Sequence, residues 1–78
     1  MAQIKPIENA DELEFVIFCV ENLAAAIHRP ADFVYHALSD GHLIDGYLVP
    51  NYEILHSQGK DYIVSDLLRA VEAKGVAL

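Results

Sequence analysis

Apolar residues recur along this chain at the three- and four-residue spacing of amphipathic helices, and proline and glycine separate the stretches in which they do so. The longest stretch spans residues 10–28. On a helical wheel its apolar side chains fill an arc close to half the circumference. They are Leu13, Phe15, Val16, Ile17, Cys19, Val20, Leu23, Ala24, Ala26 and Ile27. This arc is wider than one core requires, so we expect the helix either to be central to the fold or to be shared with a second copy of the chain.

Both ends of this first helix are marked in the sequence. Asn9 is expected to cap its start, and Glu12 is expected to reach back to the backbone amide of Asn9. The helix should end near His28, because Pro30 keeps the residue before it, Arg29, out of the helical conformation.

Three shorter helices are predicted after it, over residues 30–40, 50–58 and 61–74. The pattern of residues 42–49 fits either a helical turn or an extended crossover. The sequence therefore predicts an all-α fold, a compact bundle of about four short helices. We expect it to form a single domain over residues 1–78, with residues 1–8 as an N-terminal arm.

Single residues mark the ends of the three shorter helices. Pro30 is placed to be the first residue of its helix. Gly41 and Gly75 can adopt the left-handed conformation that closes a helix, and Gly59 is expected to stop the third helix. Asp61 is expected to cap the fourth helix through its side chain.

The charge balance excludes several classes of partner. Five Lys and Arg residues against twelve Asp and Glu residues give a net charge of −7. Binding to nucleic acids or to anionic membranes depends on clustered basic residues, so we expect neither kind of partner. A basic protein partner is compatible with this charge, and so is a surface that is charged for solubility alone.

The cysteine content and the apolar runs indicate the compartment. Cys19 is the only cysteine, so an internal disulfide is excluded. The longest strongly apolar run, Phe15 to Val20, is far shorter than the roughly 20 residues of a membrane span. The first residues lack the pattern of a signal peptide. We therefore expect a cytoplasmic protein.

The segment HSQGKDY, residues 56–62, gathers residue types that are common in active sites. Its Gly59-Lys60 step lacks the upstream glycine and the following Ser or Thr of a phosphate-binding loop. His56 and Ser57 are adjacent, so their side chains diverge on a helix and do not meet as base and nucleophile. We interpret the segment as the junction between two helices, and we predict no catalytic residue.

No metal site and no cofactor are predicted. The spacing of the histidines, at positions 28, 36, 42 and 56, does not place two ligands on one helical face. Cys19 lies within the apolar arc without a nearby cation to lower its pKa. Such a position favours a buried, unreactive thiol.

Two motifs resemble those of a known family. The first, EFVIFCVENLA, carries an EF-x-x-FC-x-E pattern, and the second is GYLVPNYEILHSQGKDYIVSDL. The matching residues of the second are Tyr47, Pro50, Tyr52, Glu53, Leu55, His56, Gly59, Asp61, Tyr62, Ile63 and Val64. From about Leu13 to Gly75 the chain resembles a family of short, uncharacterised bacterial proteins that form a domain of unknown function.

The resemblance implies no activity, because none is assigned to that family. Genes of the family tend to lie in small clusters, some of them beside toxin-like ADP-ribosyltransferase domains. The resemblance therefore implies an accessory or antitoxin-like interaction protein, with a protein partner encoded nearby.

The leading hypothesis is a non-catalytic protein–protein interaction module that associates with itself as a homodimer. It is supported by the lack of residues arranged for catalysis, by the wide apolar arc of the first helix and by the acidic composition. We assign the self-association surface to Phe15, Phe18, Cys19 and Asn22. In the competing arrangement the N-terminal arm, with Ile4 and Ile7, folds back and covers the arc within one chain.

The alternative hypothesis is a small ligand-binding or enzymatic domain. Its site would be built from Tyr47, Tyr52, His56 and Lys60. Together with Tyr62, the same residues form the candidate surface for a partner. A pocket on which the four side chains converge would favour a ligand site.

Overall fold

Helices make up most of the chain, and no residue from 5 to 78 lies in a strand. The computed structural model describes residues 5–78. Its elements are α1 (Ala10–Ile27), α2 (Ala31–Asp40), the π-helical turn η1 (Ile44–Leu48), α3 (Tyr52–Leu55) and α4 (Lys60–Lys74). The predicted all-α fold is confirmed. None of the helices in the described residues is long and apolar enough to cross a membrane.

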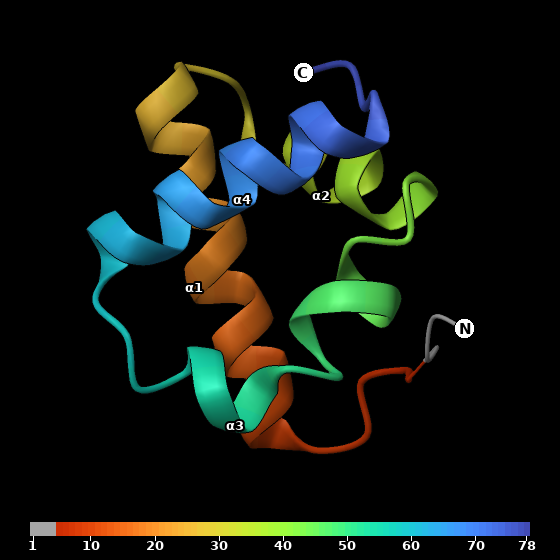
Figure 1. Ribbon diagram of the computed structural model, residues 1–78, viewed down its shortest axis with the longest axis vertical. Coiled ribbons are helices and arrows are strands. Elements are labelled where there is room, and N and C mark those ends of the chain that lie inside the picture. The colour runs from red at the N-terminus through yellow and green to blue at the C-terminus, as the bar shows by residue number, and fades with distance from the viewer. Residues whose placement is uncertain (1–4) are drawn as a thin grey trace.

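The longest helix, α1, runs along the length of the molecule, and α4 crosses it (Figure 1). α2 and α4 both contact α1, whereas α3 lies near the N-terminal end of α1. One core lies between these elements. Its buried apolar side chains are Phe15, Val16, Cys19, Val20, Leu23, Ala24, Val34, Leu38, Leu43, Ile44, Leu48, Val49, Leu55, Ile63, Leu67 and Val71.

The chain covers most of the wide apolar arc of α1 by itself. The buried residues of this helix are Glu12, Phe15, Val16, Cys19, Val20, Leu23 and Ala24. From the N-terminal arm, Ile7 packs against the core, while Ile4 lies outside the described residues. Leu13 and Ile17, at one edge of the arc, remain exposed. The helix is therefore central to its own fold, and the exposed residues of its arc are Leu13 and Ile17 at one edge and Ala26 near the other.

The start of α1 is capped largely as predicted. The Asn9 side chain accepts a hydrogen bond from the Glu12 amide at 2.9 Å. The Glu12 carboxylate, however, accepts from the amide of Glu8 at 2.9 Å, so the prediction that it would reach the amide of Asn9 is wrong. The arm turns back at this point, because the Lys5 amide donates to the carbonyl of Asp45 in η1. This turn brings the Glu8 amide to the carboxylate.

At two helix ends the structure differs from the prediction by one residue. Pro30 is the cap that precedes α2, not its first residue. Gly41 has φ −84°, and the left-handed residue is His42, with φ 57°. Gly41 is needed there for space, because a Cβ atom on it would lie 2.6 Å from Cγ2 of Val76. Gly75, with φ 70°, closes α4 in the left-handed conformation, as predicted.

Residues 42–49 adopt the helical alternative, in the form of a π-helical turn. Backbone amides donate to carbonyls five residues earlier, as from Leu48 to Leu43 and from Val49 to Ile44. All four of these side chains are buried, so the wider turn directs them into the core together.

The junction before α4 differs from the prediction. α3 ends at Leu55 with His56 as its C-terminal cap, so Gly59 does not stop it. Gly59 instead precedes α4 as its N-terminal cap, without a side-chain hydrogen bond. Because α4 begins at Lys60, Asp61 lies inside the first turn and does not cap the helix. Its carboxylate can stabilise α4 only through the helix dipole.

These two helix starts make a matched pair for mutation. Asn9→Ala removes a side-chain cap and should lower the free energy of unfolding by about 0.5–2 kcal/mol. Asp61→Ala removes a dipole interaction only and should cost about 0.3–1 kcal/mol, less at high salt. Urea denaturation of both variants measures the difference. An Asp61→Ala variant that is destabilised more than Asn9→Ala contradicts this assignment of the two caps.

Candidate functional site

Two of the predicted site residues, Tyr52 and His56, are brought together by α3. Their rings stack with centroids 4.4 Å apart and an angle of 7° between the planes. Nδ1 of His56 lies 2.7 Å from the Tyr52 carbonyl oxygen. A carbonyl oxygen only accepts hydrogen bonds, so Nδ1 carries the proton and Nε2 is left for other partners. The rings of Phe15 in α1 and Tyr52 pack edge to face, with centroids 5.4 Å apart.

The other predicted site residues lie elsewhere. The Tyr47 hydroxyl donates a hydrogen bond to the carboxylate of Asp66, which joins η1 to α4. Lys60 lines a separate groove between α1 and α4. Tyr62 is half exposed. The four residues of the alternative hypothesis, Tyr47, Tyr52, His56 and Lys60, therefore do not converge on one pocket.

A groove between α1 and α3 contains the stacked pair. It measures about 310 Å³ and is lined by Asp11, Glu14, Phe15, Phe18, Tyr52, His56 and Gln58. We call it the α1–α3 groove. Asp11 and Glu14 were not among the predicted site residues. Their spacing with Phe18, at i, i+3 and i+7, already places them on one face of a helix, but nothing in the sequence shows that α3 lies across that face.

The α1–α3 groove has an acidic rim. Asp11 and Glu14 are exposed, and no ion pair between described residues involves either of them. The pKa of Tyr52 is raised, first by burial and then by the nearby carboxylates of Asp11, Glu12, Glu14 and Glu53. The hydroxyl of Tyr52 therefore lies in a negative electrostatic potential.

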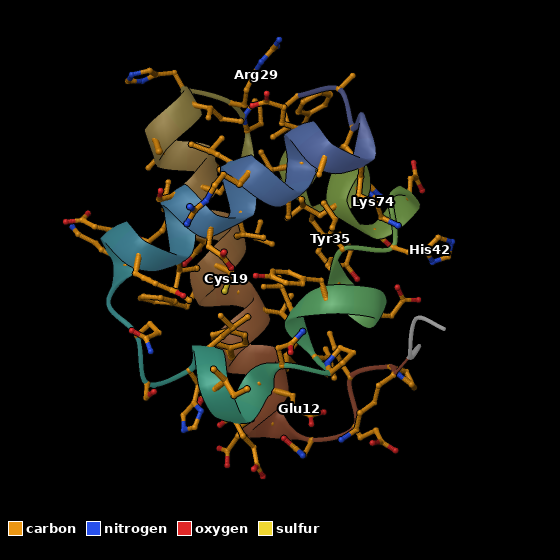
Figure 2. All side chains as sticks on the ribbon, in the orientation of Figure 1. Glu12, Cys19, Arg29, Tyr35, His42 and Lys74 are labelled. Atoms are coloured by element: carbon orange, nitrogen blue, oxygen red, sulfur yellow. The ribbon has the colours of Figure 1, made fainter. Side chains whose placement is uncertain are left out.

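Two of the residues predicted for self-association are not available at the surface. Phe15 is 7 % exposed and Cys19 is 0 % exposed, both within the core of their own chain. Figure 2 shows Cys19 in the middle of the molecule, while Arg29 and His42 point to its periphery. Phe18 is exposed, and the side chain of Asn22 donates to the Phe18 carbonyl at 2.8 Å. Phe15 and Cys19 therefore offer no exposed area to a self-association surface, whereas Phe18 does.

A second groove, between α1 and α2, exposes the uncovered edge of the arc. It measures about 320 Å³ and is lined by Leu13, Val16, Ile17, Val20, Glu21, Ala31, Asp32, Tyr35 and His36. We call it the α1–α2 groove. Leu13, Ile17 and Tyr35 are 47 %, 45 % and 40 % exposed. Leu13 and Ile17 belong to the predicted arc, but which edge of the arc the fold leaves open depends on how α2 packs.

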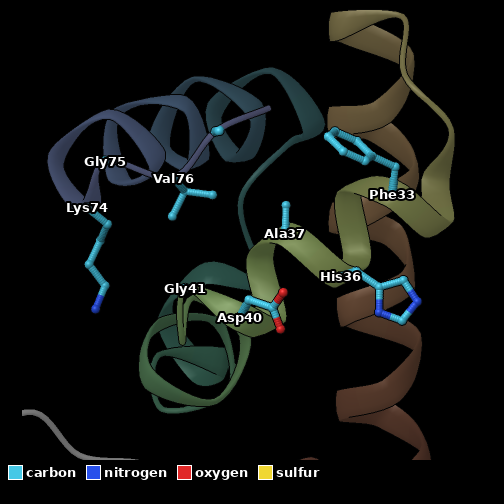
Figure 3. Close-up of a pocket in the computed structure, with 9 residues that line it drawn as sticks. Phe33, His36, Ala37, Asp40, Gly41, Lys74, Gly75 and Val76 are labelled. Atoms are coloured by element: carbon cyan, nitrogen blue, oxygen red, sulfur yellow. The ribbon is translucent and has the colours of Figure 1, made fainter.

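A third hollow lies between α2 and the residues that follow α4 (Figure 3). Its volume is about 520 Å³, and the side chain of Val76 packs beside Gly41 within it. Near this end of the molecule the Arg29 guanidinium lies over the ring of Phe33, with 5.3 Å between Cζ and the ring centroid. The contact of Val76 with Gly41 packs the residues after α4 against the end of α2. Neither contact brings a nucleophile next to a base.

The titratable groups offer little chemistry. Burial raises the pKa of the Cys19 thiol to about 12, so the thiol is protonated at neutral pH. Among the described residues, no three His, Cys, Asp or Glu side chains are grouped so that they could hold a metal ion.

Comparison with known proteins gives one match. Residues 14–74 match DUF3791, a family described as proteins of unknown function. No curated protein and no solved structure matches the chain. The match covers both motifs, EFVIFCVENLA and GYLVPNYEILHSQGKDYIVSDL, and confirms the resemblance to a family of unknown function.

Proposed function

The chain belongs to the DUF3791 family, and we propose that it is a non-catalytic protein–protein interaction module that associates with itself. The observation that carries this proposal is the apolar surface of the α1–α2 groove. Three large apolar side chains, Leu13, Ile17 and Tyr35, are each at least 40 % exposed there. Apolar surface of this kind, rimmed by polar residues, is characteristic of protein interfaces.

The occupant that we propose for the α1–α2 groove is a second copy of the chain. Leu13 and Ile17 line the groove, so a two-fold axis passing beside α1 would bring these side chains of each copy against the groove of the other. Glu21 and Asp32 also line the groove, but most of its other lining side chains are apolar. Burying one large apolar side chain contributes about 1.5–3 kcal/mol, comparable with the net stability of about 3–5 kcal/mol of a domain this small.

The dimer would act by binding a partner protein encoded nearby, in an accessory or antitoxin-like role. The support for this role is the net charge of −7, which favours a basic partner over nucleic acid, together with the resemblance of both motifs to the family. Catalysis plays no part in the proposal, because Tyr47 and Lys60 lie apart from the stacked pair Tyr52 and His56.

Light scattering coupled to size-exclusion chromatography tests self-association. At micromolar concentration we expect a mass of twice the 8.7 kDa chain. Ile17→Glu should return the mass to that of one chain, because a charge would be forced into the apolar interface. The matched control is Ile54→Glu, at an α3 residue that is 69 % exposed and lies outside the α1–α2 groove.

A wild-type mass of one chain throughout the micromolar range would overturn self-association. An Ile17→Glu variant that remains a dimer would show instead that the interface lies elsewhere. Circular dichroism of both variants establishes that they are folded.

A further inference from the structure

The α1–α3 groove combines aromatic walls with carboxylates at its rim. From α1 come Asp11, Glu14 and Phe18, which share one face of the helix, while α3 contributes Tyr52 and His56. This face of α1 is not the one that forms the α1–α2 groove.

The walls of the α1–α3 groove are held in place before any ligand arrives. His56 is fixed at 2.7 Å to the Tyr52 carbonyl oxygen and stacks on the Tyr52 ring. Phe15, 7 % exposed, supports the Tyr52 ring from the core side. Phe18 is 39 % exposed and leaves part of its ring open to a ligand. A preformed site of this kind loses little conformational entropy on binding.

The negative charge of the α1–α3 groove is not paired with a basic side chain of the described residues. Asp11 and Glu14 take part in no ion pair there. Lys5 is paired with Glu8 and Glu12 instead, at 3.9 and 3.8 Å. Burial raises the pKa of Tyr52 first, and the carboxylates of Asp11 and Glu14 raise it further.

We propose that the α1–α3 groove binds an arginine side chain of a basic partner protein. Its guanidinium would stack on the open aromatic face of Phe18 and would donate hydrogen bonds to Asp11 and Glu14. Arginine fits better than lysine, because its planar cation both stacks on aromatic rings and donates two parallel hydrogen bonds to a carboxylate. A second copy of the chain is a poor source of this cation, since it carries five basic residues and a net charge of −7.

This inference rests on the proposed function as an interaction module and names the chemistry of its partner. The probe is a short fluorescein-labelled peptide of alternating arginine and glycine, titrated at low salt and followed by fluorescence anisotropy. We expect saturable binding, at least several-fold tighter than for the same peptide with lysine in place of arginine. Equal affinity for the two peptides would overturn the stacked arginine site.

Two charge-matched variants separate the α1–α3 groove from the general acidity of the surface. Glu14→Gln removes a carboxylate of this groove, and Glu72→Gln removes an exposed carboxylate of α4 that lines neither the α1–α3 nor the α1–α2 groove. Glu14→Gln should weaken binding about tenfold, the loss expected for one charge-assisted hydrogen bond. Glu72→Gln should leave it nearly unchanged. Equal weakening by both would mean non-specific attraction and would overturn the proposal.

A third variant tests the aromatic wall. Phe18→Ala should weaken binding of the arginine peptide while leaving the weaker binding of the lysine peptide nearly unchanged. If this variant does not fold, Glu14→Gln, at an exposed position, still decides the question. Molecular masses measured by light scattering on the same samples distinguish a failure of self-association from a failure of the arginine site. A wild-type monomer that binds the arginine peptide contradicts self-association alone, and a dimer that does not bind it contradicts the arginine site alone.

Discussion

Replacing Leu67 by alanine is expected to lower the free energy of unfolding by about 2–5 kcal/mol and to leave much of the protein unfolded at room temperature. Leu67 is 1 % exposed and lies on the face of α4 that packs against α1. The truncation would remove buried methyl groups and leave a cavity that neighbouring side chains fill only in part. A domain of this size rarely has more than about 3–5 kcal/mol of net stability, so the loss is comparable with the whole.

The next residue supplies the control. Leu68 is the same residue type on the same helix but is 39 % exposed. Leu68→Ala has the same small effect on helix propensity and should cost less than about 1 kcal/mol. Circular dichroism at 222 nm during urea denaturation, a standard signal of helix content, compares the two variants. Similar losses in both would contradict the packing of α4 described above.

Hydrophobic periodicity was sufficient to predict the fold class and the positions of the main helices. α1, α2 and α4 each bury a stripe with helical spacing, and Gly75 closes α4 where the sequence indicates. The errors lie at the helix ends, because candidate caps compete over one or two residues. Asp61 would cap a helix that began at Tyr62, but α4 begins at Lys60, and the carboxylate then falls inside the first turn.

Coverage of the apolar arc could not be predicted from sequence. Its width suggested a shared surface around Phe15, Phe18, Cys19 and Asn22, yet Phe15 and Cys19 are buried in the core of their own chain. A helical wheel states which residues share a face, but the order in which other elements pack on that face depends on contacts far apart in sequence. For this reason the large residues of the arc that remain exposed are Leu13 and Ile17, at one edge.

The α1–α3 groove was predictable only in its parts. Tyr52 and His56 are four residues apart on a helix, and Asp11, Glu14 and Phe18 share a face of another. Their convergence depends on the path between α2 and α3, where the sequence allowed either a helical turn or an extended crossover and the structure has a π-helical turn. Each face could therefore be recognised in advance, whereas the groove between them required the structure.

The stability of the protein should fall as the pH rises from about 9 to about 12, because of Cys19. Burial raises the pKa of its thiol from the ordinary value of 9.0 to about 12. Below pH 9 the thiol is protonated in both the folded and the unfolded chain, so its pKa difference has no effect. Above that pH the unfolded chain releases the proton first, which favours unfolding until the folded thiol also ionises.

Cys19→Ala removes this titration and should flatten the alkaline decline in the free energy of unfolding, measured by urea denaturation across that pH range. Tyr52, whose pKa is also raised, remains in the variant, so the difference between the two proteins isolates the thiol.

Alkylation by iodoacetamide, followed by mass spectrometry, tests the burial of the Cys19 thiol independently at neutral pH. Cys19 is 0 % exposed and should react only after denaturation. Rapid alkylation of the folded protein would mean that α1 opens at this position, and the buried thiol could not then be the source of the alkaline decline.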